Sequence, residues 1–207
     1  MIYTDRVVIW LSSVNTLCRD SAACVAVLAA CGESGRNTPS FIAGRRMLAC
    51  ATGIPALSTL ISLPQGKPAF PSTSLPGFSI SHSGDLIALA LIHGAEIGLD
   101  IEVNRPRPVH RIHNLASRWF SPEEQQRLRS IPNDAEVHTE FWRCWTAHEA
   151  VIKQRGDVVW KIRPEDTTAA TLAEQKQALH TWYTSEYVVS LCCPNHLTVT
   201  TPRFIDW

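Results

Sequence analysis

Residues 97–104, with the sequence IGLDIEVN, form the stretch that organises this chain of 207 residues. Apolar and polar side chains alternate along it, which predicts a strand with one buried face. The alternation places Asp100 and Glu102 together on the opposite face. Two carboxylates this close repel each other unless a cation lies between them, and their hard oxygen atoms suit Mg²⁺. The spacing alone also fits a solvent-facing strand that carries two unrelated acids.

The segments before this stretch also show strand patterns. Residues 78–81 alternate, residues 83–85 have turn composition, and residues 86–92 form an apolar run typical of a central strand. With residues 97–104 they predict a three-stranded meander. Nearer the N-terminus we expect a strand over about 6–12 and a helix from Pro39 to about 51, with Thr38 as its N-cap.

Residues 21–31 are almost entirely apolar and predict a buried helix that ends at Gly32. The apolar part is about half the ~20 residues that a membrane span needs. The N-terminus also lacks the basic segment of a secretory signal. We therefore expect no membrane segment.

Downstream, Ser121-Pro122-Glu123-Glu124 predicts the start of a helix with a capping box. A longer helix is predicted over about 140–155 and ends at Gly156. Residues 182–193 and 196–201 have strand character. These patterns, helices and strands in separate runs, favour an α+β fold.

The helix over 140–155 carries Trp142, Trp145, Glu149 and Lys153 on one stripe. The Glu149–Lys153 spacing predicts an ion pair beside two tryptophans, and such a pair is partly buried. A buried acid and base need further partners or a function. The alternative is a surface pair, which contributes only a few tenths of a kcal/mol.

Composition excludes several classes of protein. Hydrophobic residues make up 45% and charged residues 18%, which is globular and not disordered. Lys and Arg number 19 and Asp and Glu number 19, so the net charge is zero and a nucleic-acid binder is disfavoured. Seven Cys without a C-x-x-C spacing indicate reduced thiols, so we expect a cytoplasmic protein.

Five short segments follow one another along the chain: GKP at 66–68, FSISHSG at 78–84, IGLDIE at 97–102, WFSPEE at 119–124 and WTAHEAVIK at 145–153. Together they resemble the 4′-phosphopantetheinyl transferases, most closely the Sfp-type class and its bacterial holo-acyl-carrier-protein synthase relatives. The resemblance implies a monomer with the α+β fold of this family, two similar α/β halves in a pseudo-two-fold arrangement. Residues 1–97 would form the N-terminal half, and residues 98–207 the half with the metal and catalytic motifs.

The resemblance implies transfer of the 4′-phosphopantetheine arm of coenzyme A (CoA) to a serine of an acyl or peptidyl carrier protein, which releases adenosine 3′,5′-bisphosphate. Mg²⁺, with Mn²⁺ as an alternative, would be held by Asp100, Glu102 and Glu149. Glu149 would also take the serine proton and Lys153 would steady the phosphate charge. The residues implied in binding CoA are Arg45, Lys67, Ser81, His82, His148 and Lys153.

Two positions depart from the family pattern. His148 stands where the family usually has Lys, and Ser40 where it usually has Arg. A His148 that faces the CoA phosphates predicts an affinity that falls as pH rises, because only the protonated ring replaces the missing Lys. Alternatively His148 points away from the site, since adjacent helix positions diverge by about 100°.

The region 105–129 contains six Arg and two Glu. This local excess of positive charge suits an acidic acyl carrier protein as partner, although it also fits a solvated helical face. The spacing of His110 and His113 makes a poor zinc site without further ligands. Two rival functions remain: a non-catalytic paralogue that binds CoA or a carrier protein, and a Mg²⁺-dependent CoA diphosphohydrolase that needs no carrier.

Overall fold

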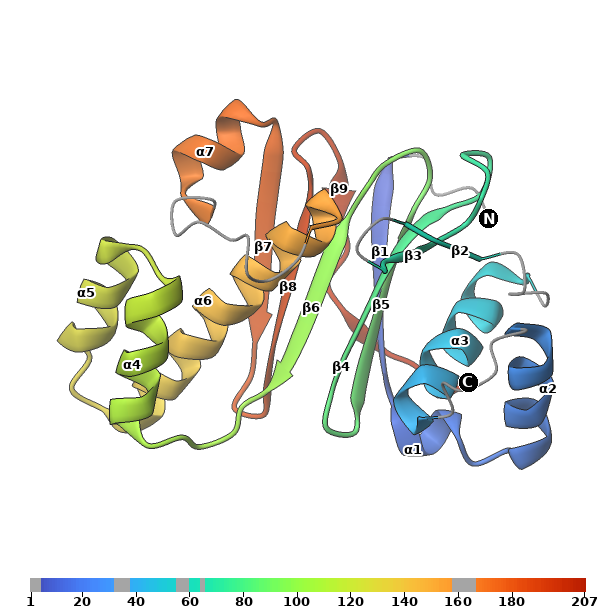
Figure 1. The fold of residues 1–207 in the computed structure, drawn as a ribbon, viewed down its shortest axis with the longest axis horizontal. Helices are drawn as coiled ribbons and strands as arrows, with labels where there is room; N and C mark the ends of the chain where they lie inside the picture. The colour runs from blue at the N-terminus through green and yellow to red at the C-terminus, as the bar shows by residue number, and fades with distance from the viewer. Residues whose placement is uncertain (1–4, 32–37, 55–59, 64–65, 158–166) are drawn as a thin grey trace.

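The computed structural model describes residues 5–31, 38–54, 60–63, 66–157 and 167–207. Two sheets lie side by side, and each is covered on its outer face by helices (Figure 1). The α+β class predicted from the sequence is therefore confirmed. No helix among the described residues is long and apolar enough to cross a membrane.

The first sheet has the strand order β10-β1-β5-β4, with β9 paired to β1. β5 is antiparallel to both of its neighbours, β1 and β4, whereas β9 and β10 run parallel to β1. The bounds of these strands are Arg6–Ser13 (β1), Gly77–Ser83 (β4), Leu86–Ile92 (β5), Thr198–Val199 (β9) and Arg203–Phe204 (β10). A short hairpin, β2 (Ile61–Ser62) and β3 (Pro68–Ala69), lies apart from this sheet.

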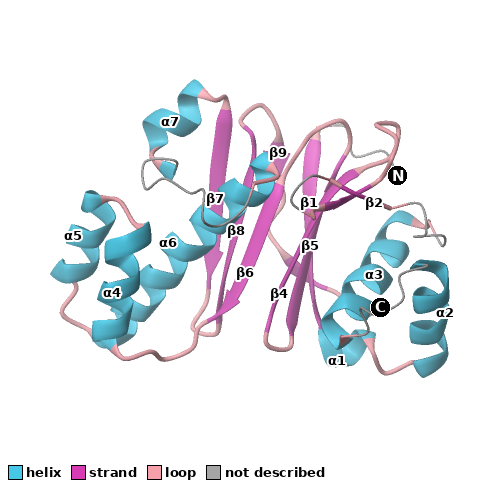
Figure 2. Ribbon diagram, in the orientation of Figure 1, coloured by secondary structure: helices cyan, strands magenta, loops and turns pink. Residues whose placement is uncertain are grey.

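The second sheet has the order β6-β8-β7 and is antiparallel throughout. Its strands are β6 (Gly98–Val103), β7 (Gln177–Tyr183) and β8 (Tyr187–Pro194). Helices α1 (Val14–Leu17), α2 (Ser21–Cys31) and α3 (Pro39–Thr52) lie on the side of the first sheet (Figure 2). Helices α4 (Val109–Trp119), α5 (Pro122–Ser130), α6 (Asp134–Arg155) and α7 (Ala169–Glu174) lie on the side of the second.

The inner faces of the two sheets share one hydrophobic core. Alternate residues of β1 and β5 meet alternate residues of β6 and β8 in a single buried cluster, which includes Ile9, Ala90, Leu99, Ile101 and Leu191. The strand predicted over residues 97–104 is therefore confirmed, with Leu99 and Ile101 in this core, but its other face is partly buried as well, because α6 covers it at Gly98 and Asp100. Met47 and Leu48 of α3 cover the outer face of the first sheet, and Ala150 and Val151 of α6 pack on the second.

The predicted three-stranded meander is wrong. β4 and β5 form a hairpin, but β6 belongs to the other sheet and pairs with β8. β6 still lies beside β4, because alternate serines of β4 point toward it. We call Ser79, Ser81 and Ser83 the serine column.

Hydroxyl groups of the serine column replace a backbone ladder at this junction. The backbone N–H groups of Leu99 and Val103 donate to Ser79 Oγ at 2.9 Å and to Ser83 Oγ at 3.1 Å. Ser81 Oγ donates to Asp100 Oδ1 at 2.7 Å. A side chain reaches further than a backbone carbonyl, so the two strands run side by side without belonging to one sheet.

The helix over residues 21–31 is confirmed, but the prediction that it is buried is wrong. α2 packs against α3 at the edge of the molecule, and Val25 is 64% exposed. The residues of this helix are apolar on every side, so the pattern contains no polar face that would mark the solvent side.

Gly98 brings α6 into direct backbone contact with β6. A Cβ atom at this position would overlap the carbonyl oxygen of Ala150 and the backbone nitrogen of Gln154. The close approach holds the helix turn between these residues, which carries Glu149 and Lys153 at its edges, over the strand that carries Asp100.

We expect Gly98→Ala to lower the free energy of unfolding by about 1–3 kcal/mol, because the added methyl group must push α6 away from β6. Urea denaturation measures this change. Gly44→Ala in α3 is the matched control, since a Cβ there would meet Ile80 and Ile87 only at ordinary contact distances. An equal loss of stability in the two variants would contradict the close-approach role of Gly98.

Candidate functional site

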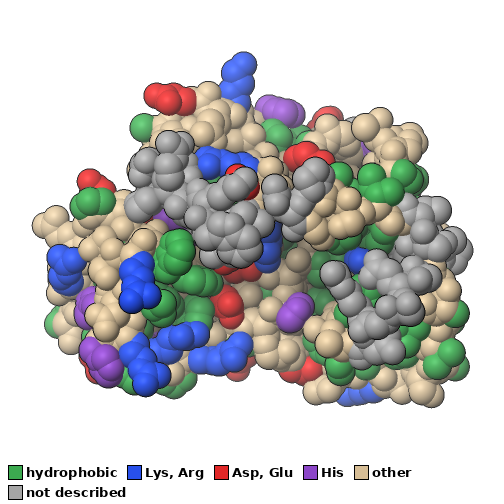
Figure 3. Space-filling view, in the orientation of Figure 1, with side chains coloured by type: hydrophobic (Ala, Val, Ile, Leu, Met, Phe, Trp, Pro, Cys, Tyr) green, Lys and Arg blue, Asp and Glu red, His purple; other side chains and the backbone are tan. Residues whose placement is uncertain are grey.

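Acidic side chains gather where the two sheets meet. In the space-filling view they lie near the centre of the face, and basic side chains gather beside them over α4 (Figure 3). Asp100 and Glu102 come from β6 and face away from the shared core, as their spacing predicts. Asp100 is only 5% exposed, so it is a buried acid and not a solvent-facing one.

Lys153 forms its ion pair with Asp100. Its Nζ donates to Asp100 Oδ1 at 2.7 Å and to Ser81 Oγ at 3.0 Å. The predicted helix pair between Glu149 and Lys153 is therefore replaced by a contact from α6 to β6. Asp100, Ser81 and Lys153 form a closed set of hydrogen bonds across the junction of the two sheets.

Ser83 holds the second carboxylate. Its hydroxyl donates to Glu102 Oε2 and accepts from Arg105 Nη2 at 2.9 Å. Arg105 Nη2 also lies 3.9 Å from Glu102 Oε2. Ser83 is not among the site residues expected from the sequence. The signal that identifies it is the S-x-S-x-S alternation, which turns its hydroxyl to the same side as that of Ser81.

The carboxylates are crowded. Burial raises the pKa of Glu149, and the negative charges of Asp100 and Glu102 raise it further against the opposing effect of Lys153. Burial also raises the pKa of Glu102, and Asp100 adds to the effect, while Ser83 and Arg105 oppose it. Negative charge at this site is therefore only partly compensated by the protein's own cations.

The chemistry of these groups fits a hard divalent cation. Asp100 Oδ2 is buried and has no hydrogen-bond partner, so one carboxylate oxygen is unsatisfied within the crowded cluster. Oxygen ligands of this kind suit Mg²⁺ or Mn²⁺. Among the described residues no three ligating side chains already converge on one point. Side-chain adjustment would therefore accompany binding of an ion.

Two adjoining cavities lie beside this cluster. One cavity of about 440 Å³ is lined by Ser40, Arg45 and His82, among others. A second cavity of about 230 Å³ is lined by Lys153, and the two share Gly66, Pro68 and Ile80. Positive side chains thus line both cavities, which adjoin at these shared residues and form one hollowed region.

Arg45 and His82 come from different elements that face this hollow. Arg45 of α3 is 7% exposed, and its guanidinium lies over the ring of Phe41 at 4.8 Å from the centroid. His82 of β4 points the opposite way from Ser81, toward α3. Burial lowers the pKa of His82, and the charge of Lys153 lowers it further.

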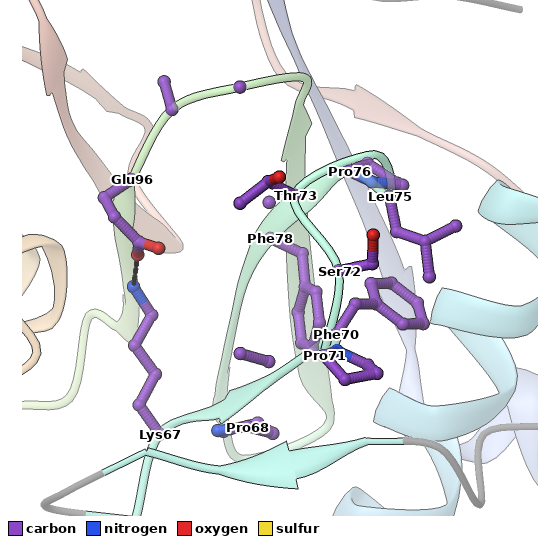
Figure 4. A pocket seen from close by; sticks show the side chains of 14 residues that line it. Lys67, Pro68, Phe70, Pro71, Ser72, Thr73, Leu75, Pro76, Phe78 and Glu96 are labelled. Atoms are coloured by element: carbon purple, nitrogen blue, oxygen red, sulfur yellow. Dashed lines mark hydrogen bonds and ion pairs between the residues drawn. The ribbon is translucent and has the colours of Figure 1, made fainter.

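Lys67 reaches away from Arg45. Its Nζ donates to Glu96 Oε2 at 2.8 Å and to the carbonyl oxygen of Ile97 at 3.1 Å. Figure 4 shows this ion pair at the mouth of a further cavity of about 330 Å³, which lies under the proline-rich loop beside Phe70 and Phe78. Glu96 is largely exposed, whereas the Lys67 side chain is largely buried and is also held by the Ile97 carbonyl oxygen.

His148 does not face the carboxylate cluster. The ring is 3% exposed, and its Nε2 lies 3.1 Å from Glu124 Oε2 on α5. The ring therefore faces Glu124 and not the position expected for a contact with the CoA phosphates. The physical reason is the 100° step between adjacent helix residues, which turns His148 toward α5 when Glu149 faces β6.

The arginines of the region 105–129 differ in what they contact. Arg127 pairs with Glu140, and Arg107 lies over the ring of Trp142. Arg111 and Arg118 are exposed on α4 and pair with no acid among the described residues. The charge available to a partner therefore lies mainly on α4.

Comparisons with known proteins point to one family. Residues 96–192 match the family model of the 4′-phosphopantetheinyl transferase superfamily. The chain is 35% identical over 173 residues to the 4′-phosphopantetheinyl transferase AcpT of Salmonella typhi, a match that covers 84% of this chain and 85% of the relative. It is 40% identical over 134 residues to AcpT of Escherichia coli K12, covering 65% and 66% of the two chains. The 4′-phosphopantetheinyl transferase HetI of a Nostoc species is 39% identical over 85 residues, which covers 41% of this chain and 35% of that protein.

The crowding of the carboxylates predicts a stabilising substitution. Because the pKa of Glu149 is raised above 4.5, folding favours its protonated form, and ionisation as pH rises through the raised pKa lowers stability. At pH 8 without divalent metal, we expect Glu149→Gln to raise the melting temperature by about 2–4 °C, the equivalent of about 1 kcal/mol for a chain of this size. Differential scanning calorimetry measures it. Glu186→Gln, at an exposed turn carboxylate, is the control and is expected to change little; a Glu149→Gln protein that melts below the wild type would refute the crowding.

Proposed function

The chain belongs to the 4′-phosphopantetheinyl transferase superfamily, and on this basis we propose that it acts as a holo-acyl-carrier-protein synthase. It would transfer the phosphopantetheine arm of CoA to a serine of an acyl or peptidyl carrier protein and release adenosine 3′,5′-bisphosphate. The observation that carries the proposal is the crowding of Asp100, Glu102 and Glu149 around Lys153, which lines a cavity next to the one lined by Arg45 and His82.

Asp100, Glu102 and Glu149 would hold Mg²⁺, with Mn²⁺ as the alternative. The unpartnered oxygen of Asp100 and the raised pKa values of both glutamates support this ligand set. A bound divalent ion neutralises charge on the diphosphate of CoA and fixes its orientation for attack. Ser81 and Ser83 keep Asp100 and Glu102 turned toward the same side.

The remaining groups act on CoA and on the acceptor serine. Lys153 supplies positive charge at the diphosphate, while Arg45, Ser81 and His82 bind the phosphates. Lys67 would contact the nucleotide after it leaves the exposed Glu96. Glu149 accepts the proton of the carrier serine as its oxygen bonds to phosphorus, and the bond from phosphorus to the departing adenosine 3′,5′-bisphosphate breaks.

The proposal is tested by mass spectrometry of an apo carrier protein incubated with CoA and Mg²⁺. The wild type is expected to add the mass of one phosphopantetheine group. Asp100→Asn keeps the shape of the side chain and removes its charge, so we expect the rate to fall about 10²-fold or more. A wild type that only binds CoA would favour the non-catalytic paralogue, and release of phosphopantetheine without a carrier would favour the diphosphohydrolase. Near-wild-type turnover by Asp100→Asn would contradict the assignment of Asp100 as a ligand of the divalent ion.

We propose that the carrier protein is acidic and docks on α4 through Arg111 and Arg118. Carrier proteins with a negative surface would be attracted to this helix, and the attraction weakens as salt screens it. Arg127, which is already neutralised by Glu140, would contribute less.

We expect Arg111→Glu with Arg118→Glu to raise the KM for the carrier protein about 10-fold at low salt and to leave the KM for CoA unchanged. Steady-state kinetics at two salt concentrations measure the effect, which should shrink at high salt. Arg127→Glu is the matched comparison and is expected to have a smaller effect. A parallel rise in the KM for CoA would place these arginines at the nucleotide instead.

The finer expectations on architecture stay predictions. These are the pseudo-two-fold relation of the halves, their division between residues 97 and 98, the monomeric state and the cytoplasmic location. Because β9 and β10 pair with β1, these two strands at residues 198–204 belong to the first sheet.

A further inference from the structure

His148 and Glu149 are neighbours on α6 that point to different places. His148 is buried against α5, whereas Glu149 lies within electrostatic reach of Asp100 and Glu102. Because consecutive residues of a helix are separated by a fixed angle, a contact that holds one of them also sets the direction of the other. The contacts that hold His148 therefore also influence the direction of the Glu149 side chain.

His148 is held from several sides. Its Nε2 lies 3.1 and 3.2 Å from the two carboxylate oxygens of Glu124. The ring of Phe120 stacks on it with 5.3 Å between centroids and an angle of 12°. Thr167 Oγ1 lies 3.3 Å from the same nitrogen. A buried ring with these contacts has little freedom to rotate.

Glu124 is itself held in place. It is the third residue of α5, and one of its oxygens accepts from the backbone N–H of Ser121 at 2.8 Å. The Ser121 hydroxyl accepts in return from the backbone N–H of Glu124, which completes a capping box. The partner of His148 is therefore part of a rigid helix start, and not a long side chain that is free to move.

We propose that Glu124 and His148 form a positioning pair, which sets the rotation of α6 so that Glu149 points toward the divalent ion and the acceptor serine. The inference rests on the proposed function and goes beyond it. His148 then serves the reaction through Glu149 and does not bind CoA. The pair explains how the WFSPEE segment, which lines neither of the two cavities described above, takes part in the site.

Another contact between the same helices provides a control. Arg127 of α5 pairs with Glu140, which lies about two turns before His148 on α6. Glu140→Gln weakens the packing of α5 on α6 without touching the turn that carries Glu149. A pair that merely holds the two helices together would behave like this control.

The test compares Glu124→Gln, His148→Gln, the double variant and Glu140→Gln with the wild type. We expect each of the first two to raise the Mg²⁺ concentration for half-maximal rate by about 10-fold or more, as is usual when a group that orients a ligand is lost. The KM for CoA at saturating Mg²⁺ should stay unchanged. The double variant should need no more Mg²⁺ for half-maximal rate than either single variant, because each single substitution already removes the same interaction. Glu140→Gln should keep the wild-type Mg²⁺ dependence.

Binding of Mn²⁺ to the CoA complex, followed by electron paramagnetic resonance, provides a readout that needs no turnover. Weaker Mn²⁺ binding in both single variants supports the pair even if the wild type transfers nothing, an outcome that would overturn only the proposed function. A raised KM for CoA in His148→Gln alone would show that His148 binds CoA. A lowered melting temperature with unchanged Mg²⁺ and Mn²⁺ dependence would show a purely structural contact. If His148→Gln does not fold, Glu124→Gln decides alone, because its amide oxygen still accepts from Ser121.

Discussion

The hydrogen bonds between the serine column and β6 are the interaction on which the rest of the structure depends. They satisfy backbone N–H groups on the edge of β6 that faces β4, and an unsatisfied buried donor there would cost about 1–3 kcal/mol. Two of the three hydroxyls, those of Ser81 and Ser83, also set the direction of the acidic side chains. Ser81 fixes Asp100 where Lys153 can reach it, and Ser83 gathers Glu102 and Arg105. One strand pattern thus joins two sheets and arranges the chemistry between them.

The charges at this junction oppose the stability of the fold. Three acids share a partly buried space with one lysine and one exposed arginine. Burial and mutual repulsion both favour protonated glutamates, which is the opposite of what a metal ligand or a general base requires. Such a cluster persists because the serine column, the close approach at Gly98 and the packing of α6 hold its members together against their repulsion.

Local patterns predicted the parts of the fold that depend on neighbouring residues. The strand around Asp100, the capping box of Ser121 and Glu124, and the helix end at Gly156 are all present. Features that depend on distant partners were not predictable in this way. Alternation in β6 does not reveal which strand it pairs with. Helix spacing predicts Glu149 as the partner of Lys153, whereas the Lys153 ammonium pairs with Asp100. A single position such as His148 likewise carries no sign of the ring that stacks on it.

The return of β9 and β10 to the first sheet has a consequence for how this protein acquires its shape. β1 is made first, yet its outer edge remains open until residues 198–204 have been synthesised and can pair with it. The contact joins residues almost two hundred positions apart, and contacts of such long range slow folding. While the chain grows on the ribosome, this edge of β1 therefore stays unpaired until the strands of the second sheet have been synthesised. The last strands act as a latch that ties the second sheet back to the first.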